Sequence, residues 1–426
     1  MRWRGLIHQT TDDAGLAAAL AARRWTVYAG FDPTAESLHV GSLMPLLALR
    51  RFQKAGHAPI ALLGGATGMI GDPSGKSKER NLLSMEQLQH NQQGIDRQIR
   101  SILDDSGTHA ARVVNNLDWT APWSYLEFLR DVGKHFPLSL MLAKDSVSTR
   151  LAREESGISY TEFSYMLLQA YDFVHLRRAY GCELQIGGSD QWGNITAGIE
   201  LGRRMYSQTL YGITFPLLLT SEGQKMGKTE KGTIWLAADK TSPYQFYQYW
   251  INVADMDAGM CLRFLTELDR DEIQALDASR QSHPEQRQSQ QRLAECLTQT
   301  IHGESGLSAA RQATRILFGG EIQGLPEREL LEIFADVPSK SVARSLLDSG
   351  WGLVEALVES GLSKSRGEAR RTIEQGGAYI NNRRCTDTAR KLESDDLAGP
   401  TVLVLRTGKK NYALLRFDAS SPPPAP

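Results

Sequence analysis

Two short motifs, far apart in the sequence, carry residues suited to acting on a phosphorylated ligand. Residues 39–42 read His-Val-Gly-Ser at the predicted start of a helix, where backbone N–H groups attract phosphate. His39 can donate to a phosphoryl oxygen whose negative charge grows in a transition state. Residues 225–229 read Lys-Met-Gly-Lys-Thr between glycines, so Lys225 and Lys228 can close over a triphosphate and neutralise it.

Each motif also has an ordinary structural explanation when it stands alone. A single histidine at a helix start is often a cap, and a pair of lysines in a loop is often just a solvated basic surface. The combination of the two motifs, about 190 residues apart, is much more specific.

A third set of polar residues lies within an otherwise apolar helical segment, residues 161–173. Spacings of four and three place Tyr165, Gln169 and Asp172 on one helical face. A solvent-facing stripe explains them in the ordinary way. If the face is buried, these groups need partners, because an unpaired buried carboxylate or amide is costly. A ligand with both an ammonium group and a hydroxyl group would supply such partners.

The fourth set is basic and lies in a compact C-terminal segment. The chain as a whole is almost neutral, with 48 basic and 49 acidic residues. A basic surface gathered on one small module is therefore the electrostatic pattern expected for RNA, although charge runs commonly form only a solvated face. The basic residues are Lys364, Arg366, Arg370, Arg371, Arg383 and Arg384.

Alternating strand and helix patterns supply the frame for the first three sets. Residues 26–31 and 59–63 read as buried strands, and residues 43–54 between them read as a helix. This βαβ unit predicts a parallel sheet of the α/β, Rossmann-like class. A later strand, residues 184–186, ends at two glycines, which is typical of the floor of a ligand crevice.

Composition changes along the chain predict several domains. The length of 426 residues allows two or three cores. We expect a Rossmann-like domain, a lysine-containing loop and connection, a helical domain, a linker, a small α+β module and a disordered tail. Their predicted ranges are 1–220, 221–243, 244–318, 319–345, 346–417 and 418–426.

The four cysteines are widely scattered, and none forms a Cys-x-x-Cys pair. This argues against a zinc knuckle or a disulfide framework, so we expect a protein of the reducing cytoplasm with no bound metal. No apolar stretch approaches membrane-spanning length.

The two phosphate-directed motifs resemble the HIGH and KMSKS signatures of class I aminoacyl-tRNA synthetases. Further phrases resemble the bacterial tyrosyl-tRNA synthetases in particular, over about residues 5–417. The C-terminal basic module is similar to an S4 RNA-binding domain. The resemblance implies that the Rossmann-like domain is catalytic and that the helical domain, residues 244–318, is of the anticodon-binding type. The matching phrases are Tyr-Ala-Gly-Phe-Asp-Pro-Thr at 28–34, Gly-Gly-Ala-Thr-Gly-Met-Ile-Gly-Asp-Pro at 64–73, Gln-Ile-Gly-Gly-Ser-Asp-Gln-Trp-Gly-Asn at 185–194 and Thr-Ser-Pro-Tyr at 241–244.

This resemblance implies roles for individual residues. The phenol of a tyrosine substrate is expected at Tyr28 and Asp172, its ammonium group at Asp72, Tyr165 and Gln169, and its carboxylate near Gln191. The residues implied for ATP are Asp32, Gly41, Ser42, Gly188, Asp190, Lys225 and Lys228. Those implied for catalysis are His39, Thr34, Lys225 and Lys228. Lys76 and Arg80 are implied for pyrophosphate or the tRNA acceptor end.

The resemblance further implies the reaction and the partners. Tyrosine would be activated by ATP, with Mg²⁺ carried on the nucleotide, and then transferred to the 3′ end of tRNA(Tyr). A homodimer is implied, with residues 119–150 near the interface. Three departures from the signatures bear on ATP affinity: Ser42 stands for the second histidine, Gly227 for the serine, and Ala29 for a cysteine common in relatives.

Other enzyme classes fit the sequence less well. Residues 75–77 end like a phosphate-binding P-loop, but the required first glycine is Ile70. No Gly-x-Gly-x-x-Gly motif opens a helix, which argues against a dinucleotide oxidoreductase. A non-catalytic relative would have lost His39 or a loop lysine. The related tryptophan enzymes have no use for a phenol-directed tyrosine and aspartate.

Overall fold

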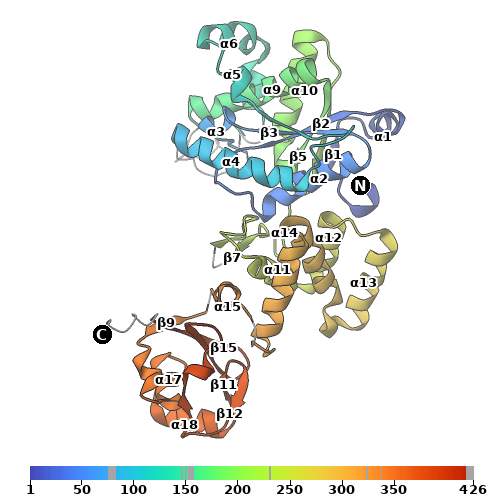
Figure 1. Cartoon of the computed structure of the whole chain (residues 1–426). Coiled ribbons are helices and arrows are strands. Elements are labelled where there is room, and N and C mark those ends of the chain that lie inside the picture. The colour runs from blue at the N-terminus through green and yellow to red at the C-terminus, as the bar shows by residue number, and fades with distance from the viewer. Residues whose placement is uncertain are drawn as a thin grey trace. The chain divides into compact units, whose positions relative to one another are not determined.

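The computed structural model describes residues 1–74, 83–144, 147–148, 151, 158–229, 232–322, 325–335 and 337–418 (Figure 1). The chain divides into two compact units. One comprises Met1–Thr241 with Phe246–Ile301, and the other Ser242–Gln245 with His302–Pro426. Among the described residues, no helix has the length and apolarity needed to cross a bilayer.

A parallel sheet lies at the centre of the first unit. Its strand order is β1-β6-β5-β2-β3-β4, and β1 alone runs antiparallel to its neighbour. Strands β2 and β3 are buried along most of their length, as expected for parallel strands covered on both faces. The strands are β1 (Gln9–Thr10), β2 (Thr26–Phe31), β3 (Ala58–Leu63), β4 (Arg112–Asn115), β5 (Cys182–Gly188) and β6 (Tyr211–Phe215).

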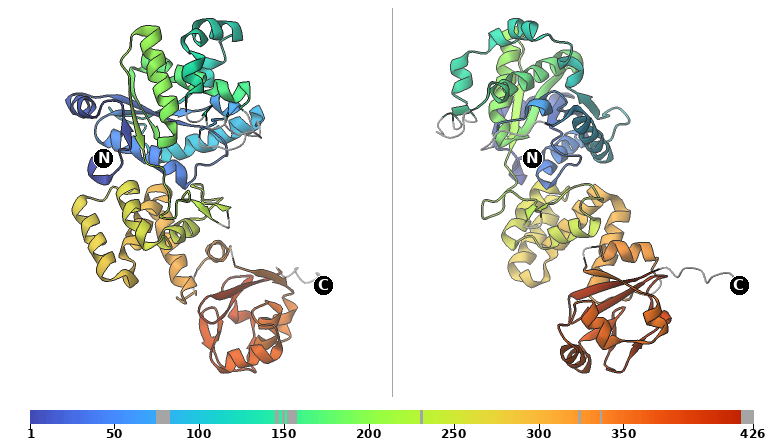
Figure 2. Two further views of the ribbon diagram at one scale, coloured as in Figure 1. Left: turned by 180° about the vertical axis from the view of Figure 1, so that it is seen from behind. Right: turned by 90° about the vertical axis from the view of Figure 1, so that its left-hand side faces the viewer.

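Helices cover both faces of this sheet. Helices α2 (Leu43–Lys54) and α4 (Met85–Ile102) lie on one face, and α9 (Tyr160–Tyr180) and α10 (Trp192–Tyr206) lie on the other (Figures 1 and 2). Right-handed crossovers explain why the helices divide between the two faces. The chain moves in one direction across the sheet from β2 through β3 to β4, and in the opposite direction from β4 to β5 and β6. The predicted βαβ unit is confirmed.

Local sequence explains where the long helix α9 begins and ends. The Ser159 side chain caps its first turn by accepting from the N–H of Glu162. Gly181 ends it in the left-handed conformation. The shorter helices of this unit are α1 (Asp13–Ala22), α3 (Thr67–Ile70), α5 (Leu117–Thr120), α6 (Tyr125–Asp131) and α7 (Leu138–Leu142).

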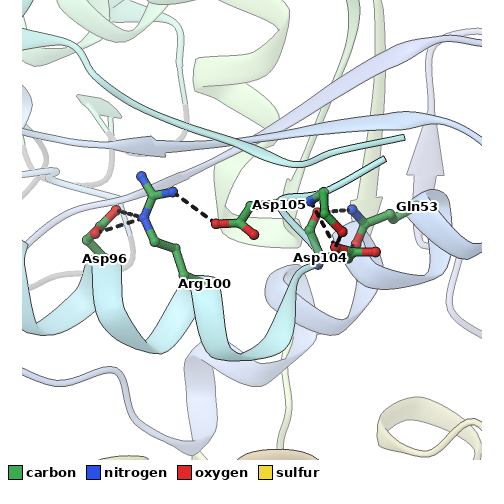
Figure 3. A network of polar contacts seen from close by, with 6 residues as sticks. Gln53, Asp96, Arg100, Asp104 and Asp105 are labelled. Atoms are coloured by element: carbon green, nitrogen blue, oxygen red, sulfur yellow. Dashed lines mark hydrogen bonds and ion pairs between the residues drawn. The ribbon is translucent and has the colours of Figure 1, made fainter. Parts of the chain in front are cut away.

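A polar network ties α2 to the turn that follows α4 (Figure 3). The Gln53 amide donates to the carbonyl of Asp104 and accepts from its N–H at 3.1 Å. Near the C-terminal end of α4, Arg100 donates to Asp96 at 3.0 Å and to Asp105 at 3.5 Å. The network joins two helices on one face of the sheet and lies apart from the crevice described below.

Between residues 243 and 317 the regular elements are all helical, which is the pattern expected from the sequence. Helices α12 and α13 belong to the first unit, whereas α11 and α14 cross from one unit to the other. Helix α14 is interrupted at Gly303, whose φ of 71° is outside the helical range. The four helices are α11 (Pro243–Ile251), α12 (Asp255–Leu265), α13 (Arg270–Ser282) and α14 (Gln288–Leu317).

The second unit is a mixed α+β structure around its own sheet. The strand order is β12-β11-β14-β15-β9, antiparallel except for the β15–β9 pair, and a two-stranded sheet joins β10 to β13. Its elements are α15 (Glu327–Ile333), β9 (Ser339–Val342), α16 (Ser345–Asp348), β10 (Trp351–Gly352), α17 (Leu353–Glu359), α18 (Arg366–Glu374), β11 (Ala378–Ile380), β12 (Arg383–Cys385), β13 (Lys391–Leu392), β14 (Val402–Thr407) and β15 (Asn411–Phe417).

The structure differs from the predicted linker at residues 319–345. This stretch is part of the second unit, because β9 pairs with β15 and Phe334 packs against the face that carries Val404 and Leu414. The described glycines and prolines of this stretch, Gly319, Gly320, Pro326 and Pro338, lie between short, well-packed elements. The unit boundary lies between Ile301 and His302.

Candidate active site

A cavity of about 460 Å³ opens at the carboxyl ends of β2 and β5. These two strands are neighbours, and the chain leaves them toward opposite sides of the sheet, so they form a topological switch point. Ligands of open α/β sheets bind in this position. Tyr28 of β2 and Gln185 of β5 are paired in register and both line the cavity.

All the residues predicted for tyrosine, ATP and catalysis line this one cavity. They come from positions as far apart as 28 and 228, and the fold brings them together. They are Tyr28, Asp32, Thr34, His39, Gly41, Ser42, Asp72, Tyr165, Gln169, Asp172, Gly188, Asp190, Gln191, Lys225 and Lys228. Lys76 and Arg80 lie outside the described residues.

Two buried groups, Tyr28 and Asp172, lie at the floor of the cavity, each with 1% of its surface exposed. The Tyr28 hydroxyl has no hydrogen-bond partner among the described residues. Asp172 accepts from the indole N–H of Trp119 at 2.8 Å and from the amide of Asn116 at 2.9 Å. The carboxylate is therefore oriented by two donors behind it, while a buried hydroxyl nearby has nothing to bond.

Burial dominates the ionisation of this pair. It raises the pKa of Asp172 to about 7, although the hydrogen bonds from Asn116 and Trp119 work in the opposite direction. Burial, with the charge of Asp172 added, raises the pKa of Tyr28 well above its ordinary value. Tyr28 therefore remains a protonated phenol and can donate a hydrogen bond.

Asp72 is the centre of a second polar group in the cavity. Its carboxylate accepts from the Gln191 amide at 2.7 Å, from the Asn194 amide at 3.3 Å and from the N–H of Ser74 at 2.9 Å. Gln191 in turn accepts from the Gln169 amide at 3.3 Å. The Gln169 carbonyl oxygen is buried and has no partner among the described residues. This arrangement presents a negative charge and an available acceptor to the cavity.

Tyr165, which was predicted to contact the substrate, is hydrogen-bonded to another side chain of the cavity. Its hydroxyl donates to Asp32 at 3.0 Å, and Asp32 also accepts from the Thr67 hydroxyl at 2.9 Å. Burial, chiefly, raises the pKa of Tyr165, with the negative charge of Asp32 adding to the effect. Tyr165 is thus a fixed donor to Asp32 whose oxygen keeps acceptor capacity toward a ligand.

The His39 motif lies just before the helix that it was predicted to begin. A short 3-10 helix, Val40–Ser42, precedes α2, so the motif lies one turn before the regular helix. The Nδ1 atom of His39 accepts from the N–H of Gly41 at 3.0 Å, so in the neutral ring Nε2 carries the proton. A Cβ at Gly41 would lie 2.8 Å from the His39 ring, which explains the glycine.

The two lysines lie in a loop whose backbone is anchored while their side chains are exposed. Lys228 begins a small hairpin of β7 (Lys228–Thr229) and β8 (Gly232–Thr233), and Lys225 forms a bridge with Leu219. Between the lysines, Met226 and Gly227 are buried. Asp72 and Asp172 both act on the Tyr165 side chain, whereas Gly227 of the lysine loop lies against Val40, next to His39, so the cavity has an acidic end and a basic end.

Several residues that line the cavity or hold its side chains were not identified from the sequence. Asn116 and Trp119 hold Asp172, Thr67 contacts Asp32, and Gln185 has a buried carbonyl oxygen with no partner among the described residues. Asn116 directly follows strand β4 just as Asp32 directly follows β2, and this position is the sequence signal that could have identified it. Among the described residues, no cluster of His, Cys, Asp and Glu is suited to a metal ion.

The basic residues predicted for RNA lie in the second unit, and all are exposed. Arg370 and Arg371 lie on α18, whereas Lys364 precedes this helix, because Ser365 caps it. Arg384 donates to the carbonyl of Gly376 at 2.8 Å. Arg366 lies 3.5 Å from a carboxylate oxygen of Glu355, and Arg383 lies 3.8 Å from one of Glu321.

Comparison with known proteins places these features in a family. Residues 20–319 match the family model described as tRNA synthetases class I (W and Y). Residues 329–415 match the model described as Tyrosine--tRNA ligase SYY-like C-terminal domain, which begins close to α15.

Individual relatives are similar over nearly the full length. The Tyrosine--tRNA ligase of Rhodopirellula baltica is 58% identical over 419 residues, which cover 98% of this chain and 95% of the relative. That of Roseiflexus castenholzii is 51% identical and covers 98% of each. The C-terminally truncated mitochondrial tyrosyl-tRNA synthetase of Aspergillus nidulans has a TM-score of 0.66 and 31% identity, over 74% of this chain and 92% of that structure.

Proposed function

This chain belongs to the class I tyrosyl-tRNA synthetases, the tyrosine–tRNA ligases, and from that premise we propose which of its residues bind tyrosine and ATP. Tyrosine occupies the acidic end of the cavity and the triphosphate occupies the basic end. The observation that carries the proposal is the pair at the floor. The buried Tyr28 hydroxyl has no partner among the described residues, and the oriented Asp172 carboxylate has remaining acceptor capacity.

A phenol bound between these two groups satisfies both. It accepts from the Tyr28 hydroxyl and donates to the carboxylate of Asp172. The ammonium group of the substrate then lies toward Asp72, the Gln169 carbonyl oxygen and the Tyr165 hydroxyl, an acceptor set for N–H donors. Phenylalanine leaves the Tyr28 hydroxyl unpaired and the remaining acceptor capacity of Asp172 unused, and this cost is what gives specificity for tyrosine.

Activation in this cavity requires no general base. The tyrosine carboxylate attacks the α-phosphorus of ATP. A carboxyl oxygen–phosphorus bond forms, which gives a mixed anhydride, and pyrophosphate leaves with the electron pair of the broken Pα–O bond. Because a carboxylate is already a nucleophile, the enzyme contributes positioning and charge stabilisation. His39, Thr34, Lys225 and Lys228 are assigned to the phosphates.

The remaining cavity residues are assigned to the nucleotide and to the second step. Gly188 and Asp190 are assigned to the ribose, and Asp32, Gly41 and Ser42 are assigned to the rest of the nucleotide; all five line the cavity. Mg²⁺ arrives with ATP, held mainly by phosphate oxygens. A ribose hydroxyl at the 3′ end of tRNA(Tyr) then attacks the activated carbonyl carbon, and AMP leaves.

A homodimer is proposed on the basis of exposed apolar side chains on α6 and α7. Leu126 has 74% of its surface exposed and Leu138 has 65%. Side chains of this kind, gathered on neighbouring short helices, mark protein interfaces. Sedimentation should give twice the chain mass, and Leu126→Glu with Leu138→Glu should give the mass of one chain.

The proposal is tested by ATP–pyrophosphate exchange with each of the twenty amino acids. We expect exchange with tyrosine and none with phenylalanine or tryptophan at the same concentration. Exchange that tyrosine does not stimulate overturns the assignment of this cavity. The C-terminal unit is proposed to bind tRNA through Lys364, Arg370 and Arg371. Replacing these three side chains should leave pyrophosphate exchange unaffected.

A further inference from the structure

Tyr249 lies on α11, outside the motifs identified in the sequence. Its hydroxyl oxygen accepts a hydrogen bond of 2.8 Å from the backbone N–H of Gly227. Gly227 directly precedes Lys228 and stands two residues after Lys225. A side chain of the helical segment thus holds the backbone of the lysine loop between its two charges.

Gly227 is also held on two other sides. Its carbonyl oxygen accepts from the N–H of Ile234 at 2.8 Å, and the Ile234 carbonyl accepts from the N–H of Val40 at 3.1 Å. A Cβ on Gly227 would lie 2.5 Å from the Cβ of Val40, and its φ of 83° is strained for any other residue. The loop backbone therefore lies directly against the residue that follows His39.

A second helix holds the neighbouring residue. The Cys261 sulfur of α12 lies 3.6 Å from the sulfur of Met226, and both side chains are buried. The loop consequently has an anchored centre, formed by Met226 and Gly227, and two exposed lysines that flank it. Small shifts of the centre move both lysines together, and a misplacement of about 1 Å is enough to cost a large factor in rate.

We propose that Tyr249 is a positioning residue for tyrosine activation, which fixes Gly227 and thereby places Lys225 and Lys228 opposite His39. This inference rests on the proposed assignment of the two lysines to the phosphates of ATP. Tyr249 acts through the loop backbone and does not touch the nucleotide.

The test is Tyr249→Phe, which keeps the ring and removes the acceptor oxygen. We expect kcat for pyrophosphate exchange to fall about threefold to tenfold, the scale of one hydrogen bond. The equilibrium constant for tyrosine binding should not change. Transfer from preformed tyrosyl-adenylate to tRNA should also keep its rate, because pyrophosphate has already left.

Tyr206→Phe is the matched control, because the Tyr206 hydroxyl accepts from Arg178 at 3.0 Å on the surface. It should leave exchange at the wild-type rate. If Tyr249→Phe lowers the melting temperature but leaves the exchange rate unchanged, the tyrosine has only a structural role and the inference is overturned.

A double-mutant cycle with Lys228→Ala separates this inference from the proposed function. If Tyr249 acts through the loop, its loss should matter less when Lys228 is already absent. An equal factor in both backgrounds overturns the role of Tyr249 alone. A Lys228→Ala enzyme with normal exchange overturns the assignment of the loop as well.

Discussion

The indole nitrogen of Trp119 lies 2.8 Å from the Oδ1 atom of Asp172, and the ring of His175 stacks on the same indole with centroids 4.3 Å apart. Asn116 holds the other carboxylate oxygen. A substrate hydroxyl therefore meets a carboxylate whose orientation is already fixed, so less conformational freedom is lost when the substrate binds.

Trp119→Phe should raise the pKa of Asp172 further above about 7. The indole hydrogen bond favours the ionised carboxylate, so its loss favours the protonated form. A phenyl ring can keep the contact with His175. The acid limb of kcat/KM for tyrosine should move to higher pH, measured by pyrophosphate exchange. Trp351→Phe in the second unit is the control, and an unmoved limb in Trp119→Phe contradicts the expectation.

The double variant Asp172→Asn with Tyr28→Phe should weaken discrimination between tyrosine and phenylalanine. It removes both partners proposed for the substrate hydroxyl. Each hydrogen bond to a charged or buried group that is removed is worth about 1.5–3 kcal/mol, or roughly tenfold to a hundredfold in relative kcat/KM. The measurement is pyrophosphate exchange with each amino acid. An unaltered ratio would remove these residues from the phenol site.

Asp172 should also make the free energy of unfolding depend on pH. Its pKa is 3.8 in the reference state and about 7 in the folded chain, so the folded state binds the proton more tightly. The stabilisation is present at low pH and is lost as pH rises toward 7. Between pH 5 and pH 8, urea denaturation should show the wild type losing about 2–3 kcal/mol more than Asp172→Asn.

Glu200→Gln is the opposite-sign control for this experiment. Arg203, with Arg204, lowers the pKa of Glu200 to about 2. Its contribution is therefore lost only as pH falls below the ordinary range, and it is constant between pH 5 and pH 8. The variant should show the same pH difference as the wild type. A matching difference in Asp172→Asn would mean that Asp172 is not the titrating group.

The sequence predicted the parts of this fold that depend on local pattern. Strands β2 and β3, helix α2 and the polar face of α9 follow from apolar spacing, and the cavity residues follow from motif resemblance. Asn116, Trp119 and Gln185 were not predicted, because their contacts with the site depend on strand register and on helix packing, which local spacing does not encode. The predicted linker at residues 319–345 was wrong for a similar reason, because β9 pairs with β15, which lies more than seventy residues later in the chain.

Lys228→Ala should slow formation of tyrosyl-adenylate and leave tyrosine binding nearly unaltered. The exposed lysine is proposed to engage phosphate mainly as charge develops in the transition state. Loss of one such interaction is worth on the order of 3 kcal/mol. Rapid-quench measurement of adenylate formation and equilibrium titration with tyrosine separate the two effects. Equal losses in both would assign the lysine to folding or to ground-state binding.

Removal of the C-terminal unit should separate activation from transfer, provided that the cut follows the unit boundary. A cut near Val337 falls inside the second unit and exposes Leu330 and Phe334, which pack against β14 and β15. A cut after Ile301 leaves the whole cavity within the remaining unit. Pyrophosphate exchange should survive this cut, and transfer of tyrosine to tRNA should fall sharply.

Charge reversal in the full chain tests the same unit without removing it. Arg370→Glu with Arg371→Glu changes two exposed side chains on α18, and Arg328→Glu on α15 is the matched control in the same unit. The double variant should bind tRNA more weakly, and the slope of log affinity against log salt should fall by about one for each phosphate that is no longer bound. Exchange should be unchanged. Transfer at the wild-type rate would show that this surface does not bind tRNA, and a joint collapse of exchange and transfer would make the unit a structural support for the cavity.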